Sequence, residues 1–105
     1  MVEVVVVIGA GSIGQAIARR VSTGRHVLLA DLRPEHAQAV TELFLDAGFD
    51  ASMATVDISS RSSVHDLAEH AAALGGVVGL VHAGEVKHLY AVAIALKPAN
   101  LAAVG

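Results

Sequence analysis

Runs of apolar residues alternate with amphipathic segments along the whole chain. A β-branched run that is interrupted only by Glu3 occupies residues 2 to 8, and similar mainly apolar runs fall at 26 to 31 and 77 to 84. Runs of this kind are typical of strands that are covered on both faces. A less hydrophobic segment at 49 to 57 predicts a strand nearer the edge of the sheet.

The segments between these strands carry apolar residues at helical spacing. They span 12 to 22, 33 to 48 and 59 to 76, with Pro34 at the start of the second and glycines at the ends, at Gly24, Gly48 and Gly75. Alternation of strands and helices implies parallel strands joined by right-handed helical crossovers. The pattern therefore predicts an α/β fold, a three-layer αβα Rossmann-like half domain with about four parallel strands.

The last twenty or so residues predict a helical tail. Val86, Leu89, Tyr90 and Ala93 recur at helical spacing. A strand at 90 to 96 would leave only about seven residues after the fourth strand, too few for a parallel crossover. Pro98 disfavours the helical conformation in the residue before it, so we expect a kink or restart there and a short final helix before the chain ends.

A glycine-rich segment follows the first strand and opens the first helix. Residues 9 to 14 match G-x-G-x-x-G in the context that a dinucleotide site requires. Gly9 permits a tight turn, Gly11 lets a pyrophosphate approach the backbone, and Gly14 lets the helix pack close to the sheet. The backbone N–H groups at Ser12, Ile13 and Gly14 would face the phosphates. The alternative is a glycine-rich turn kept only for packing.

A carboxylate at the end of the second strand suits an adenosine ribose. Asp31 lies 22 positions after Gly9, where this fingerprint places an acidic residue. Such a carboxylate accepts hydrogen bonds from both ribose hydroxyls and repels a 2′-phosphate, which favours NAD over NADP. Arg33 leaves NADP as an alternative cofactor, because a nearby guanidinium can accommodate the 2′-phosphate. The alternative role for Asp31 is a helix N-cap ahead of Pro34.

Two further strand ends carry polar residues. Asp57 and Ile58 follow the third strand and could meet an adenine edge through the carboxylate and a backbone N–H. The alternative is that Asp57 caps the next helix. His82 ends the fourth strand and is more typical of a wall residue than of an acid or base. The other histidines lack metal-ligand spacing, so no metal site is expected.

Composition narrows the class of protein. The chain has 105 residues, 54% of them hydrophobic and 16% charged, with a formal net charge of -3, which predicts one domain over 1–105. Without a basic stripe, neither nucleic acid nor an anionic membrane is an expected partner. The longest apolar run, Val4 to Ala10, is about half of a membrane span. The absence of cysteine fits a cytoplasmic location.

Four segments together resemble the amino-terminal half of the short-chain dehydrogenase/reductase family: VVIGAGSIGQAIA, LLADLR, TVDISSRSSV and GLVHAG. The resemblance implies an NAD(P)-dependent oxidoreductase domain with strand order 3-2-1-4. It also implies a glycine loop for the cofactor, and its other cofactor-binding positions correspond to Asp31, Leu32, Asp57, Ile58, His82, Ala83 and Gly84.

Three departures from the family pattern limit the expected activity. The glycine loop is one residue shorter than the family's Thr-Gly-x-x-x-Gly-x-Gly, with Ile8 at the threonine position, and HAG lacks one residue of the usual HAAG or NNAG. The chain stops where the family's fifth strand should begin, so the catalytic Ser and Tyr-x-x-x-Lys have no counterpart. Tyr90 is followed four residues later by Ile94. We therefore expect NAD(H) binding without hydride transfer by this chain alone.

Two other classes of function stay open, and a homodimer is expected. The first is a regulatory nucleotide-sensing module resembling the ligand-gated domains of potassium transport systems. The second is a structural or engineered fragment without retained binding. Because no fifth strand is expected, the strand at 77 to 82 would expose an apolar edge, which predicts a homodimer or segment exchange through 77 to 105.

Overall fold

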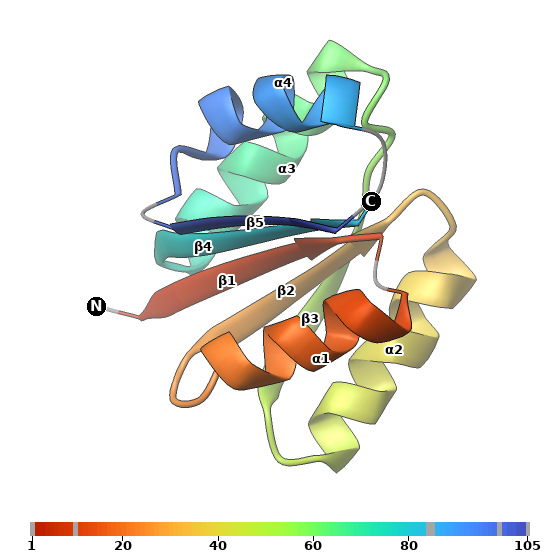
Figure 1. Cartoon of the computed structure of the whole chain (residues 1–105), viewed down its shortest axis with the longest axis vertical. Helices are drawn as coiled ribbons and strands as arrows, with labels where there is room; N and C mark the ends of the chain where they lie inside the picture. Colours follow the sequence, from red (N-terminus) through yellow and green to blue (C-terminus); the bar gives the residue numbers. More distant parts are fainter. Residues whose placement is uncertain (1, 10, 84–85, 99, 105) are drawn as a thin grey trace.

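The computed structural model describes residues 2–9, 11–83, 86–98 and 100–104. Strands and helices alternate through these residues, as the sequence predicts (Figure 1). The elements are β1 (Glu3–Ile8), α1 (Ser12–Val21), β2 (His26–Asp31), α2 (Pro34–Asp46), β3 (Asp50–Thr55), α3 (Arg61–Leu74), β4 (Gly76–Ala83), α4 (Val86–Leu96) and β5 (Asn100–Val104).

The strands form one parallel sheet in the order β3-β2-β1-β4-β5. Helices α1 and α2 lie on one face of the sheet, and α3 and α4 lie on the other (Figure 1). The predicted three-layer αβα arrangement and the order 3-2-1-4 are confirmed. This is a Rossmann-like fold, and β3 is an edge strand, as its lower hydrophobicity predicts.

The end of the chain differs from the predicted helical tail. The helix over 86–96 is confirmed, and it ends before Lys97, whose φ of 48° is left-handed. The predicted short final helix is wrong, because residues 100 to 104 pair in parallel with β4 from Gly79↔Asn100 to Ala83↔Val104. A fifth strand is therefore present. Helix α4 lies between the two strands in the chain and provides the helical connection that a parallel crossover needs.

The fifth strand also changes the expected edge of the sheet. Strand β4 is hydrogen-bonded to β1 on one side and to β5 on the other, so it is an interior strand. The argument that an exposed edge at 77 to 82 requires a homodimer is therefore wrong. The two edges of the sheet are β3 and β5.

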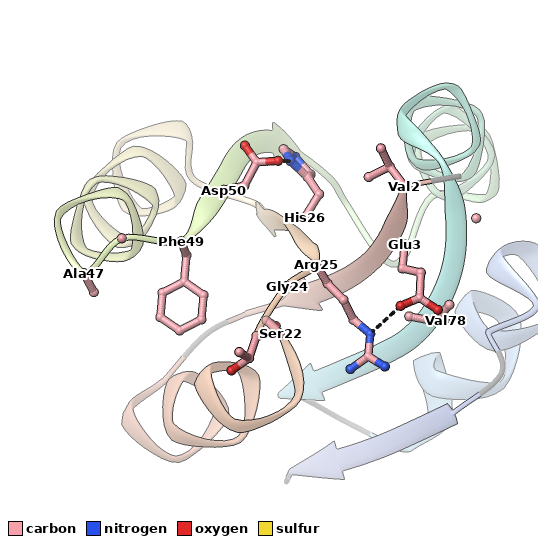
Figure 2. A pocket seen from close by; sticks show the side chains of 13 residues that line it. Val2, Glu3, Ser22, Gly24, Arg25, His26, Ala47, Phe49, Asp50 and Val78 are labelled. Atoms are coloured by element: carbon pink, nitrogen blue, oxygen red, sulfur yellow. Dashed lines mark hydrogen bonds and ion pairs between the residues drawn. The ribbon is translucent and has the colours of Figure 1, made fainter.

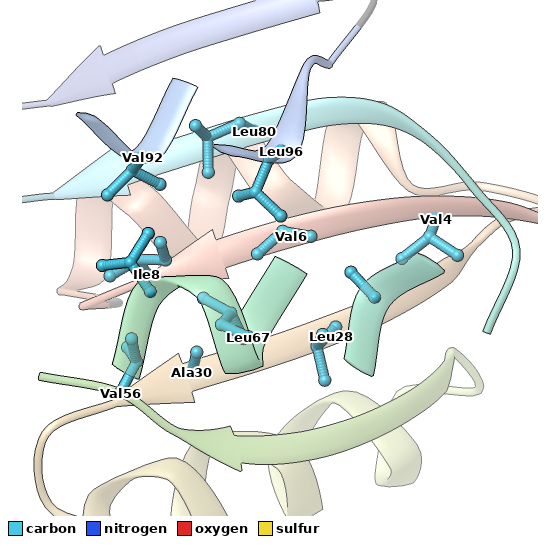
Figure 3. Packing of buried hydrophobic residues seen from close by; sticks show 12 residues of the cluster. Val4, Val6, Ile8, Leu28, Ala30, Val56, Leu67, Leu80, Val92 and Leu96 are labelled. Carbon is cyan, nitrogen blue, oxygen red and sulfur yellow. The ribbon is translucent and has the colours of Figure 1, made fainter. Parts of the chain in front are cut away.

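The core lies on both faces of the central strand β1. Val4, Val6 and Ile8 face the α3 and α4 side, where they pack with Leu67 and Val92 (Figure 3). The intervening residues of β1 face α1 and α2 instead and join a second buried cluster that includes Phe44. Burial of both faces explains why residues 4 to 8 of this strand form an unbroken apolar run. None of the helices that the structure describes is long and apolar enough to cross a membrane.

Candidate functional site

A cavity of about 200 Å³ lies at the carboxyl edge of the sheet, where the loops after β1, β2 and β3 meet. Its lining consists of Ile8, Gly9, Asp31, Leu32, Val56, Asp57 and Ile58. The structure thus brings together five of the residues that the sequence predicts for cofactor binding, and it adds two apolar neighbours. Ligands of open parallel sheets bind at this edge.

Backbone hydrogen bonds continue beyond the strand ends and hold these loops together. The Gly9 N–H donates to the Ala30 carbonyl (3.0 Å), and the Val56 N–H donates to the Asp31 carbonyl (3.0 Å). These bonds place the start of the glycine loop beside the end of β2, and the loop after β3 beside Asp31. The walls of the cavity are therefore set by main-chain geometry.

The glycine loop is open and ends on a helix N-terminus. Gly9 has a φ of 67°, the left-handed conformation that its predicted role in a tight turn requires. Gly11 is the N-cap of α1, and a Cβ placed on it would meet nothing within 4 Å. The Gln15 N–H makes the first intrahelical bond, to the Gly11 carbonyl (2.9 Å). The earlier N–H groups, from Ser12 to Gly14, lack intrahelical acceptors, as at any helix start, and can bind an anion.

The Asp31 carboxylate is held by contacts at both oxygens. Its Oδ1 accepts a hydrogen bond from the Arg33 backbone N–H (3.0 Å), and its Oδ2 lies 2.5 Å from the His36 Nδ1. The side chain is 14% exposed, so part of it can reach a ligand. The N-cap of α2 is Arg33, so the alternative role of Asp31 as that cap is wrong. Leu32, beside it, is exposed at the cavity rim.

Asp57 closes the turn that precedes α3. Its Oδ1 accepts hydrogen bonds from the backbone N–H (3.0 Å) and the hydroxyl (2.6 Å) of Ser59, while its own N–H donates to the Ser63 Oγ (2.8 Å). The N-cap of α3 is Ser60, whose side chain accepts from the Ser63 N–H (3.3 Å). The alternative role of Asp57 as the helix cap is therefore wrong, and its exposed carboxylate lines the cavity.

His82 and Ala83, the described residues predicted at the end of β4, are not part of the described lining of this cavity. His82 is 1% exposed and is paired in register with Ile8 of β1 and Ala103 of β5, which fits a wall residue. Ala83 is the last residue of β4, and Gly84 lies outside the described residues. Because β4 neighbours β1 on the side opposite β2, His82 and Ala83 are on the far side of β1 from Asp31.

His36 is the residue at this edge that sequence reasoning missed. It is the third residue of α2, and the first turn of that helix brings its ring back to the carboxylate at the end of β2. The signal in the sequence was a histidine five positions after the predicted ribose-binding aspartate, just after a helix start marked by Pro34.

A wider cavity of about 1160 Å³ lies at the opposite, amino-terminal edge of the sheet (Figure 2). Strand starts and helix ends line it, and an ion pair between the Arg25 Nε and the Glu3 Oε1 (3.1 Å) crosses it. Its described lining includes none of the residues predicted to bind a cofactor. Size alone therefore does not identify the functional edge, whereas the position of the glycine loop does.

Comparison with known proteins agrees with the fold and with the loop pattern. Residues 3–95 match the family model described as short chain dehydrogenase. A curated relative, the short-chain dehydrogenase/reductase bsc3 of Alternaria brassicicola, is 39% identical over 100 residues, which cover 95% of this chain and 36% of the relative. The chain thus spans about a third of the length of that relative.

Solved structures share the fold at lower identity. The protein gox2181 is 20% identical with a TM-score of 0.85, over 99% of this chain and 53% of the other. A variant of actinorhodin polyketide ketoreductase, solved with NADPH, is 23% identical with a TM-score of 0.82, over 90% and 46%. The family match over most of the residues, together with the curated relative, decides the assignment: the chain belongs to the short-chain dehydrogenase family.

Proposed function

We propose that this chain binds NAD(H) and forms the cofactor-binding part of a short-chain oxidoreductase. The observation that carries the proposal is the single cavity that joins Gly9, Asp31 and Asp57 next to the N-terminus of α1. The family supports a nicotinamide dinucleotide as the cofactor class. The choice of NAD over NADP rests on the Asp31 carboxylate, which would repel a 2′-phosphate.

The residues present fit the parts of such a cofactor. The open space beside Gly11 leaves room for a pyrophosphate against the backbone, and the N–H groups at the start of α1 would donate to it. The first turn of this helix carries no acidic residue, so its positive dipole end is not offset there. Asp31 would accept the ribose hydroxyls, and the adenine would enter the cavity beside Asp57 and Ile58.

The role of this chain is to bind and orient the cofactor. A bound nicotinamide would supply the hydride chemistry. Gly9 and Gly11 would determine how closely the pyrophosphate approaches the backbone, and Asp31 would hold the ribose in place. The roles proposed for the residues above are binding and orientation. Tyr90, the single tyrosine of the sequence, is followed four residues later by Ile94 instead of a lysine, so we expect binding without turnover by the chain alone.

Titration of the 105-residue chain with NADH, followed by the rise in cofactor fluorescence, tests the proposal. The Asp31→Ala variant should bind NADH at least about tenfold more weakly, because two hydrogen bonds to a charged acceptor are lost. Asp66→Ala is the matched control, since Asp66 is an exposed aspartate on α3. It should leave the affinity unchanged.

Gly11→Ala tests the second contact. A Cβ there meets nothing within 4 Å but would project into the space assigned to the pyrophosphate, so NADH should bind at least about tenfold more weakly in a variant that stays folded. Circular dichroism of each variant establishes the fold. Absence of saturable binding by the folded parent chain would overturn the proposed function.

A further inference from the structure

We propose that His36 is a positioning residue that holds the Asp31 carboxylate in the ribose site and thereby enforces the preference for NAD over NADP. The inference rests on the proposed function and deepens it. Its basis is the 2.5 Å contact between the His36 Nδ1 and the Asp31 Oδ2, which joins the first turn of α2 to the end of β2.

The direction of this hydrogen bond follows from the chemistry of its partners. An ionised carboxylate only accepts hydrogen bonds, so the His36 Nδ1 carries the proton and donates it. The His36 side chain is 36% exposed, whereas that of Asp31 is 14% exposed. The ring is thus the more exposed partner of the pair, and a short contact to a charged acceptor is among the stronger hydrogen bonds in proteins.

After the two hydrogen bonds from the protein, the carboxylate keeps enough acceptor positions to bind a ribose diol. A carboxylate has about four acceptor positions, two on each oxygen. The Arg33 N–H uses one on Oδ1, and the His36 Nδ1–H uses one on Oδ2. One position on each oxygen remains, which matches the 2′- and 3′-hydroxyls of one ribose. Asp31 is thus oriented before the cofactor arrives, which lowers the cost of binding.

The hydrogen bond from His36 also keeps the Asp31 carboxylate from moving aside for a 2′-phosphate. The cavity that Asp31 and His36 line together with Ala30, Ala37 and other apolar side chains is only about 10 Å³, at the lower limit for one water molecule. This cavity is too small to take up the carboxylate, and the hydrogen bond from His36 restrains the carboxylate from rotating. Without His36, Asp31 could rotate away, and the exposed Arg33 would then favour the phosphate.

Dissociation constants for NADH and NADPH, measured by fluorescence on the parent chain and three variants, test this role. His36→Ala should weaken NADH binding while NADPH binding holds or tightens. The ratio of the NADPH to the NADH dissociation constant should therefore fall about tenfold, as expected for loss of one hydrogen bond to a charged group. His36→Asn should restore most of the ratio, because its amide N–H can replace the Nδ1–H.

His65→Ala is the matched control. His65 is an exposed histidine on α3 whose partner, Glu69, lies one turn further along the same helix. Its removal should leave both affinities unchanged. A purely structural role for His36 would weaken both cofactors by the same factor, and that result would overturn the inference.

The two levels of the proposal fail in different ways. If the folded parent chain binds neither cofactor, the proposed function is wrong, and the inference falls with it. If the parent binds NADH but His36→Ala leaves the ratio unchanged, the inference alone is wrong. Failure of His36→Asn to recover the ratio lost in His36→Ala would also overturn it, because the hydrogen-bond donor would then not be the cause.

Discussion

At position 75 glycine is required because there is no room for a side chain, and not because of the backbone conformation. Its φ of 161° is extended and accessible to any residue, but a Cβ placed on it would lie 2.1 Å from the Val2 carbonyl oxygen. The same oxygen accepts a hydrogen bond from the Gly76 N–H (2.9 Å). The end of α3 can therefore pass this close to the start of β1 only where the side chain is missing.

We predict that Gly75→Ala lowers the free energy of unfolding by about 1–3 kcal/mol, the range for overpacking that the backbone must relieve by moving. Urea denaturation measures the effect. Gly11→Ala is the control at this scale, because a Cβ there meets nothing within 4 Å and the φ of -72° suits alanine. Equal destabilisation by the two substitutions would contradict the steric explanation.

The edge strand β3 is joined to β2 by a short array of polar side chains. The His26 Nδ1 lies 2.9 Å from the Asp50 Oδ2, and the His26 Nε2 lies 2.7 Å from the Ser52 Oγ. In the register of the two strands, His26 is directly opposite Asp50. The histidine side chain is only 11% exposed, whereas that of Asp50 is 77% exposed. The array therefore helps to fix the register of an edge strand that offers few fully buried side chains.

Unequal burial in this array gives a prediction about its two contacts. Ser52→Ala should lower the free energy of unfolding by about 1–3 kcal/mol, because a largely buried ring nitrogen loses its partner. Asp50→Ala should cost less, because the Asp50 side chain is largely exposed and water can replace its contact with the ring. Urea denaturation of the two variants compares the costs. A larger loss for Asp50→Ala would show that the exposed charge, and not the buried nitrogen, dominates.

The limits of sequence-based prediction are clear at the level of elements. The unbroken apolar run of β1 predicts a central strand, and Pro34 and Gly48 predict the bounds of α2, because these signals are local. Strand β5 has the sequence NLAAV. Alanine and asparagine have low β-strand propensity, so the strand conformation of this segment depends on pairing with β4. Likewise, the spacing from Gly9 predicts Asp31 as the ribose-binding residue. Its contact with His36 depends on the direction in which the first turn of α2 leaves the end of β2, and the sequence does not encode that direction locally.

At the scale of the whole molecule, one face and one edge of β4 are covered by segments that follow it in the chain. Helix α4 contributes Val92 and Leu96 to the buried cluster that also contains Leu80. Strand β5 then pairs with β4 over five register positions. The apolar edge that would drive self-association is thus covered within the chain, and an isolated β4 edge exists only when β5 is removed.

Deletion of residues 99 to 105 should therefore expose the edge of β4 and lead to self-association. The N–H and C=O groups of β4 that pair with β5 would lose their partners beside an apolar strand, and such edges pair with other chains. We predict a lower free energy of unfolding and concentration-dependent self-association, measured by urea denaturation and sedimentation velocity against the full 105-residue chain. A truncated chain that stays monomeric with unchanged stability would mean that β5 contributes little to the sheet. Self-association of the full chain to the same extent would mean that the contact lies elsewhere, because β4 is already paired there.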